Sequence, residues 1–243
     1  ALVLTVDAPV SGLRERDLRN GFKLPFRFTP STLLDLALHP AWSLGMAMQG
    51  RSPSFDNLTE SDDGATSPQV QAALLSRTMD RTLVWEHLAW LRRLWDGPLV
   101  IKGLLHPDDA RRAVSHGADA IVVSNHGGRQ LDAVPSTISV LPRMVDAVAQ
   151  RIPVFVDGGF RRGSDVVKAL AAGATPAFVG RPPGWGMATG GVGGARGVLA
   201  ALCEDIARTM ILIGADRVAD ISPRHLLANT QGPHAFQAGD LHG

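Results

Sequence analysis

The sequence contains no tyrosine and only one cysteine, Cys203, in 243 residues. One cysteine excludes an internal disulfide framework and is consistent with a reducing compartment. Cys203 ends an apolar run over residues 198–203 that is typical of a helix. We therefore expect its thiol to be buried and unreactive, and not a catalytic nucleophile.

Long apolar runs and an excess of one charge are also lacking. No uncharged apolar stretch reaches the roughly 18 residues that a membrane-spanning helix requires, so we expect no such helix. The formal net charge is +1, from 24 basic and 23 acidic residues, and the basic residues do not cluster, which excludes the electrostatic footprint of a nucleic-acid-binding protein. The histidines show no metal-ligand spacing and no signal peptide opens the chain, so we expect a cytoplasmic protein without a metal site.

Five short runs of apolar, often β-branched residues predict strands, at residues 1–6, 98–101, 120–124, 153–156 and 177–179. Their nearly continuous hydrophobicity is typical of strands buried on both faces of a parallel sheet. Helical patterns lie between the last four strands, at residues 107–116, 137–150 and 164–173, with Ser164 as the expected N-cap of the third and Gly173 at its end. The spacing, about one strand per 20–35 residues, indicates the repeated βαβ unit of a barrel or a doubly wound sheet.

The chain begins directly in the first predicted strand, and five strands are too few to close an eight-stranded barrel. If the fold is a barrel, we expect three strands to precede Ala1, so that this chain is truncated. We expect one barrel domain over residues 1–243, interrupted by a long insertion loop over residues 20–84.

The insertion has an apolar first part and a polar second part. Residues 33–48 are apolar, with five leucines, two methionines and Trp42, and are broken by Pro40. Residues 51–68 are rich in Ser, Asp, Gly and Pro and are expected to be flexible. Two interpretations stay open. The insertion is either a lid packed on the barrel or, over residues 20–64, an interfacial segment that dips into a membrane surface.

Each predicted strand is followed by polar residues that can bind or transfer charge. Barrel enzymes build their active sites from residues at the C-terminal ends of the strands, so these residues form the candidate site. They are Thr5, Asp7 and Arg14 at and after the end of the first strand, Lys102 at the end of the second, Ser124 to Arg129 at the end of the third, Asp157 to Gly163 after the fourth, and Gly180 with Arg181 after the fifth.

The last two strand ends carry glycine turns accompanied by arginine, Gly158-Gly159 with Arg161 and Gly180 with Arg181. Backbone N–H groups and guanidinium groups bind anions, and the late strands of barrels commonly bind phosphate at this position. A tight turn without a ligand would explain the first glycine pair alone. The two turns together favour a phosphate site.

His126 lies between Asn125 and two glycines, with Arg129 three residues further along. This arrangement suits a base that accepts a proton beside a cation that holds a carboxylate, and Asp7 could orient the imidazole. A structural role is the alternative for a lone histidine. Lys102, flanked by apolar residues, is either a Schiff-base nucleophile or a fixed positive charge beside a cofactor, and the pattern alone does not choose.

The segment Ser124–Asp132 (SNHGGRQLD) is very similar to the active-site segment of the FMN-dependent 2-hydroxy-acid dehydrogenases and oxidases. Supporting similarities follow in the family's order from residue 1 to about residue 227, at residues 5–9, 14–17, 100–103, 157–163 and 180–181. Residues 39–44 look most like the mandelate and lactate dehydrogenase branch, whose long loop is associated with the membrane.

The resemblance implies a (β/α)8 TIM barrel, of which this chain covers about the last five strands. It implies FMN as cofactor and oxidation of an (S)-2-hydroxy acid, of mandelate or lactate type, to the 2-oxo acid. His126 matches the catalytic base, Asp7 its carboxylate partner, and Arg14 and Arg129 the pair that binds the substrate carboxylate. The remaining matches are to the cofactor site, namely Thr5, Lys102 and Ser124 around the flavin ring, Asp157 at the ribityl chain, and Gly158, Gly159, Arg161, Gly180 and Arg181 at the phosphate.

The resemblance also implies an electron acceptor, either quinone or oxygen, peripheral contact with the inner face of the cell membrane, and a homo-oligomer. The family's substrate-binding tyrosines precede the matching part, which explains the lack of tyrosine. Two features depart from the family pattern: residues 182–186 (PPGWG) replace an aromatic-containing helix start, and Pro176 precedes the last strand. The alternatives are a catalytically incomplete fragment or degenerate paralogue, and a Schiff-base aldolase using Lys102, which would explain neither the His126 segment nor Arg14.

Overall fold

The computed structural model describes residues 1–21, 28–48 and 79–227. The chain divides into two compact units, and each is described by itself. Unit 1 comprises Ala1–Thr5, Trp85–Gly128 and Ala133–Gly243, and unit 2 comprises Val6–Val84 and Arg129–Asp132.

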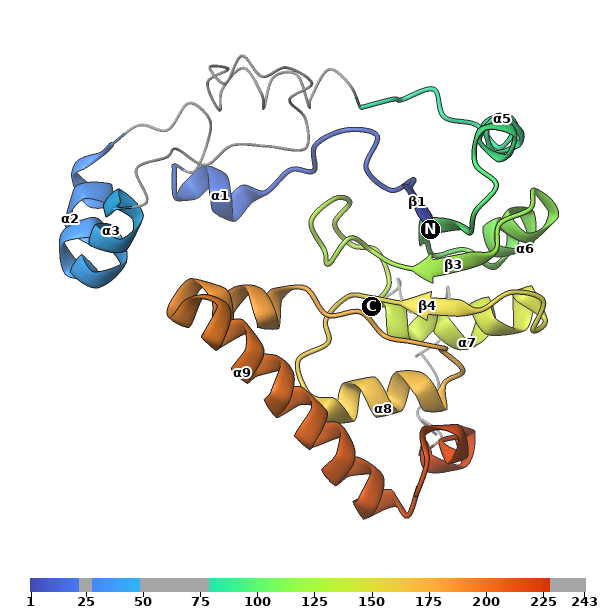
Figure 1. Ribbon diagram of the computed structural model, residues 1–243. Coiled ribbons are helices and arrows are strands. Elements are labelled where there is room, and N and C mark those ends of the chain that lie inside the picture. Colours follow the sequence, from blue (N-terminus) through green and yellow to red (C-terminus); the bar gives the residue numbers. More distant parts are fainter. Residues whose placement is uncertain (22–27, 49–78, 228–243) are drawn as a thin grey trace, which may run out of the picture. The chain divides into compact units, whose positions relative to one another are not determined.

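A parallel sheet forms the centre of unit 1. Its strands are β1 (Leu2–Thr5), β2 (Leu99–Leu104), β3 (Ala120–Val123) and β4 (Val154–Val156), and their order in the sheet is the order along the chain (Figure 1). A doubly wound sheet reverses its strand order at a switch point, whereas a barrel adds each strand beside the previous one. Among the described strands the order never reverses, which favours the barrel.

The fifth predicted strand is reduced to one bridge between Val156 and Ala177. Pro176 has no N–H to donate, but its carbonyl accepts from the Val156 N–H at 3.2 Å, and the Phe178 N–H donates to the Val156 carbonyl at 2.8 Å. The segment therefore lies beside β4 as predicted, with shorter strand pairing.

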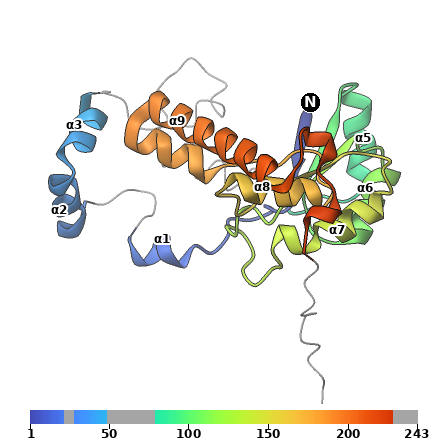
Figure 2. The same cartoon turned by 90° about the horizontal axis from the view of Figure 1, so that it is seen from below.

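Helices follow the strands of unit 1: α5 (Glu86–Leu94), α6 (Pro107–Ser115), α7 (Thr137–Val148), α8 (Gly163–Ala171) and α9 (Arg181–Ile213), then the 3-10 turns η2 (Val218–Asp220) and η3 (Pro223–His225). The three helices predicted between strands are confirmed as α6, α7 and α8. Non-helical backbone at Gly190 and Gly191 breaks α9 into two segments, the second of which lies beside α8 (Figures 1 and 2). The prediction of Ser164 as N-cap is wrong, because α8 begins at Gly163 and Arg162 occupies the cap position.

The core of unit 1 lies between the sheet and its helices. All four residues of β3 are buried, and Leu99, Leu141, Met144 and Val156 are among the buried side chains around them. The prediction that Cys203 is buried is wrong, because its side chain is exposed on α9. Within this run, Val198 and Leu202 are partly buried and line a cavity, whereas Cys203 lies on the exposed side of the helix.

Unit 2 contains α1 (Glu15–Arg19), α2 (Pro30–Leu38) and α3 (Pro40–Met48). None of these three helices was predicted from the sequence. Thr29 caps α2 by accepting the Thr32 N–H at 3.2 Å, and Pro30 occupies its first turn. No residue of α2 or α3 is buried. Among the helices of the described residues, none combines the length and the hydrophobicity that a membrane span requires. The stretch over 51–68 that was expected to be flexible lies outside the described residues.

Candidate active site

Three polar side chains meet at the carboxyl ends of β2, β3 and β4. The Lys102 Nζ donates to the Ser124 Oγ at 3.0 Å and forms an ion pair with the Asp157 Oδ2 at 3.2 Å. Ser124 is fully buried, and the Lys102 and Asp157 side chains are 22% and 20% exposed. A Schiff-base nucleophile needs a neutral amine, whereas here a carboxylate and a hydroxyl hold an ammonium group. The geometry favours the fixed positive charge for Lys102.

Thr5 lies beside this cluster, because it ends β1 and pairs with Lys102 in the register of β1 and β2. The second oxygen of Asp157, Oδ1, is buried and has no hydrogen-bond partner among the described residues. A buried carboxylate oxygen without a donor is costly, so this atom calls for a donor such as a ligand hydroxyl.

The glycine turn after β4 has left-handed backbone at Gly158 and Gly159, with φ values of +99° and +82°. A Cβ on Gly158 would lie 2.9 Å from the Asn125 Oδ1, so this position requires glycine for both conformation and space. A Cβ on Gly159 or Gly180 would meet no described atom within 4 Å. The turns after β4 and before α9 therefore leave open space beside their backbone.

Two arginines lie near these turns. The Arg161 Nη1 donates to the Phe160 carbonyl at 3.0 Å, and its guanidinium lies 5.0 Å from the centre of the Trp185 ring. The Arg181 Nη2 donates to the Gly127 carbonyl at 2.5 Å. Trp185, which departs from the family pattern, thus stacks on a predicted phosphate ligand. Pro182 is buried in the first turn of α9, where proline is compatible with a helix.

His126 lies in a turn of left-handed backbone. The φ values of His126, Gly127 and Gly128 are +55°, +65° and +70°. Left-handed backbone costs a non-glycine residue about 1–2 kcal/mol, so external contacts must hold His126 in place. Its N–H donates to the Ser124 Oγ at 3.0 Å, and the Gly128 N–H donates to the Asn125 carbonyl at 2.9 Å.

Three of the predicted residues, Asp7, Arg14 and Arg129, belong to unit 2. Asp7 is half-buried and both arginines are exposed. The segments that carry the arginines pack against each other: the Gln130 Nε2 donates to the Val10 carbonyl at 3.2 Å, and a Cβ on Gly12 would lie 2.2 Å from the Arg129 carbonyl oxygen. Pairing of Asp7 with His126 stays a prediction.

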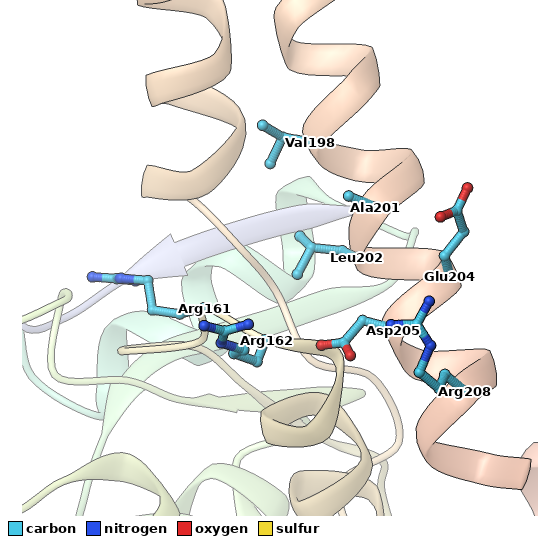
Figure 3. A pocket seen from close by; sticks show the side chains of 8 residues that line it. All are labelled: Arg161, Arg162, Val198, Ala201, Leu202, Glu204, Asp205 and Arg208. Atoms are coloured by element: carbon cyan, nitrogen blue, oxygen red, sulfur yellow. The ribbon is translucent and has the colours of Figure 1, made fainter. Parts of the chain in front are cut away.

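Asp205, which was not predicted from the sequence, lies on α9 and points toward the turn before α8 (Figure 3). Its Oδ2 accepts the Gly163 N–H at 2.6 Å and so caps α8 from another helix. The two residues are 42 positions apart and no local motif joins them. A cavity of about 360 Å³ lies here, lined by Arg161, Arg162, Val198, Ala201, Leu202, Glu204, Asp205 and Arg208.

The residues of unit 1 fit the chemistry of FMN. The buried Asp157 Oδ1 can accept from a ribityl hydroxyl, and the open glycine turns with Arg161 and Arg181 can bind a phosphate dianion. The Lys102 ammonium can supply a positive charge beside a flavin ring. Among the described residues, no group of three or more His, Cys, Asp or Glu side chains could hold a metal ion.

Known proteins give an independent comparison. A sequence model of the family described as FMN-dependent dehydrogenase matches residues 1–228. The chain is 46% identical over 225 residues to (S)-mandelate dehydrogenase of Pseudomonas putida, covering 93% of this chain and 56% of that protein. It is 44% identical over 220 residues to 2-hydroxyacid oxidase 1 of Mus musculus, covering 90% of this chain and 54% of that protein.

A solved structure gives the same result. The crystal structure of the monotopic membrane protein (S)-mandelate dehydrogenase matches with a TM-score of 0.87 and 46% identity, over 93% of this chain and 59% of that chain. The chain thus spans little more than half the length of these relatives. The match confirms the predicted fold class, a partial (β/α)8 barrel. On the family match and the two relatives together, the chain belongs to the family of FMN-dependent dehydrogenases.

Proposed function

We propose that the protein oxidises an (S)-2-hydroxy acid of mandelate or lactate type to the 2-oxo acid, with FMN as its cofactor. One observation carries the proposal. The left-handed turn at His126 is anchored on Ser124, whose hydroxyl also accepts from Lys102. Through Ser124, hydrogen bonds thereby connect His126, which can accept a proton from the substrate, with Lys102, the cation proposed to lie beside the flavin.

Each residue has a defined task in this reaction. FMN, when bound, supplies the acceptor for the two electrons that leave the substrate α-carbon. His126 accepts a proton from the α-hydroxyl or, in the other route, from the α-carbon, and Asp7 orients its ring. Arg14 and Arg129 bind the substrate carboxylate, because planar guanidinium groups fix a carboxylate in orientation as well as position. Lys102 stabilises the negative charge that accumulates on the ring.

Anaerobic addition of substrate to the FMN-loaded protein tests the proposal. We expect (S)-mandelate or (S)-lactate to bleach the visible flavin absorbance, and the (R)-enantiomer at the same concentration to leave it unchanged. Reoxidation by oxygen or by a quinone analogue then identifies the electron acceptor. Protein that binds FMN but is bleached by no (S)-2-hydroxy acid would support the alternative, a catalytically incomplete fragment or degenerate paralogue.

Helices α2 and α3 are proposed to contact a membrane surface. Their large apolar side chains are exposed, including Leu34 at 62%, Leu38 at 68%, Trp42 at 51% and Met48 at 79%. Exposed apolar residues on short helices are typical of interfacial segments, which lie in the membrane surface without crossing it. A protein of known structure that matches this chain is described as a monotopic membrane protein, which supports the proposal.

A further inference from the structure

The turn that carries His126 needs contacts from outside itself. His126, Gly127 and Gly128 all have left-handed backbone, and the first of them is not a glycine. Ser124 anchors the start of the turn through the His126 N–H. Gly127 lies in the middle of the turn, and its carbonyl accepts a hydrogen bond from the Arg181 Nη2 at 2.5 Å.

Arg181 reaches this carbonyl from the start of α9, 54 positions along the chain from Gly127. Its side chain is half-buried, and a Cβ on Gly127 would lie 3.4 Å from the Arg181 Nη2. The guanidinium would thus remain in ordinary contact with a side chain here, and it is the φ of +65° that favours glycine at position 127. A guanidinium has five N–H donors in a fixed plane, so the bond to Gly127 leaves other donors for an anion.

We propose that Arg181 is a positioning residue for His126: its guanidinium holds the Gly127 carbonyl and thereby keeps the turn in the conformation that presents the base. This role is separate from the phosphate contact, and it rests on the proposed function only in taking His126 as the base. Arg161 gives the contrast, because its guanidinium donates to the Phe160 carbonyl and stacks on Trp185. Arg181 thus serves both the predicted phosphate site and the turn that carries His126.

Hydrogen–deuterium exchange tests the inference in FMN-loaded and FMN-free protein. In Arg181→Lys we expect the amides of residues 126–128 to exchange roughly three- to tenfold faster in both forms, while β3 keeps its exchange rate, because one hydrogen bond is lost. Arg181→Met, which has no N–H donor, serves as the second variant, and we expect it to raise exchange of these amides at least as much. Arg161→Lys is the control: we expect weaker FMN binding and unchanged exchange of the turn in FMN-free protein.

Steady-state kinetics at saturating FMN give the second readout. We expect Arg181→Lys to lower kcat by roughly tenfold, because a misplaced base loses its alignment with the substrate. Exchange of the turn that equals that of the Arg161 variant, or that rises together with exchange of β3, overturns the inference. If His126→Ala keeps its turnover, the proposed function fails while the exchange result for Arg181 still stands, so the two failures are distinguishable.

Discussion

Arginine and lysine carry the same charge at positions 14 and 129, but they hold a carboxylate differently. A guanidinium binds both carboxylate oxygens in one plane, whereas an ammonium acts as a point charge. We expect Arg129→Lys, and separately Arg14→Lys, to lower kcat/KM by about 10- to 100-fold, as for loss of a charged hydrogen bond of about 1.5–3 kcal/mol.

The control for these two variants is a 2-hydroxy amide matched to the acid substrate. We expect the wild type to prefer the acid and each variant to lose much of that preference. If wild type and variants treat acid and amide alike, neither arginine binds the carboxylate. Each would then be a surface residue.

At the scale of single residues, the sequence identified the types of side chain but not all of their contacts. The sequence left two roles open for Lys102, a Schiff-base nucleophile and a fixed positive charge. The ion pair with Asp157, which follows β4 and lies 3.2 Å from the Lys102 Nζ, favours the fixed charge. The expectations for Ser164 and Cys203 failed because capping and burial depend on the neighbouring element. Asp205, which takes the expected capping role for α8, comes from a helix far along the chain.

The connection between α5 and the sheet depends on an ion pair. Arg92 forms a short contact with Asp119 and donates to the Gly97 carbonyl at 2.7 Å. The Asp119 Oδ2 accepts the Leu99 N–H at 2.8 Å, and this hydrogen bond, followed by that from Arg92, lowers the pKa of Asp119 below its ordinary value of 3.8. The folded state therefore binds this proton less readily than the unfolded state.

Because the pKa of Asp119 is lower in the folded state, its carboxylate stabilises the fold at pH values above the pKa of the unfolded state. This stabilisation is lost as the pH falls through the pKa of the folded state. We expect Asp119→Asn to lower the free energy of unfolding at neutral pH, by less than about 1 kcal/mol because the side chain is half-exposed. Thermal unfolding of both proteins from neutral pH to below about pH 4 measures this. A difference in Tm that stays constant down to the lowest pH would contradict the account.

Helices α8 and α9 approach so closely that Gly163 has no room for a side chain. A Cβ there would lie 2.2 Å from the Ile206 nitrogen and 2.4 Å from the Asp205 carbonyl carbon. We expect Gly163→Ala to force the helices apart and to lower the free energy of unfolding by about 1–3 kcal/mol or more. FMN affinity should fall as well, because the turn with Arg161 directly precedes α8.

Gly197 gives a matched control on the same helix α9. A Cβ there meets no described atom within 4 Å, and its backbone is not left-handed. Alanine should stabilise this position by about 0.5–1 kcal/mol, because glycine is a poor helix former. Equal destabilisation of both variants in denaturant unfolding would contradict the close packing of α8 on α9.

For the whole molecule, local periodicity in the sequence predicted the parallel sheet and the helices between its strands. It left a barrel and a doubly wound sheet open, and the resemblance to the family implied the barrel. The helices α2 and α3 were not predicted, because their apolar residues face solvent and give no amphipathic pattern. The convergence of distant residues, such as Arg181 on Gly127, depends on tertiary packing and has no local signal.

The proposed membrane contact is also a property of the whole molecule. We expect replacement of Leu34, Leu38 and Trp42 by serine to move the protein from vesicle pellets to the supernatant, because each buried apolar side chain contributes roughly 1.5–3 kcal/mol. Binding should persist at high salt, since α2 and α3 contain no lysine or arginine. Full visible absorbance of bound FMN is the control for folding. Wild-type protein that never sediments with vesicles would favour the lid.

The central claim is that His126 transfers a proton and does not hold the cofactor. Turnover of (S)-mandelate or (S)-lactate by His126→Ala, measured together with bound FMN per protein, tests this most directly. The account predicts a kcat lowered by about 10²–10⁴-fold, the usual contribution of a general base, with FMN content close to that of the wild type. A loss of less than tenfold, or a loss of activity that only follows the loss of FMN, would contradict it.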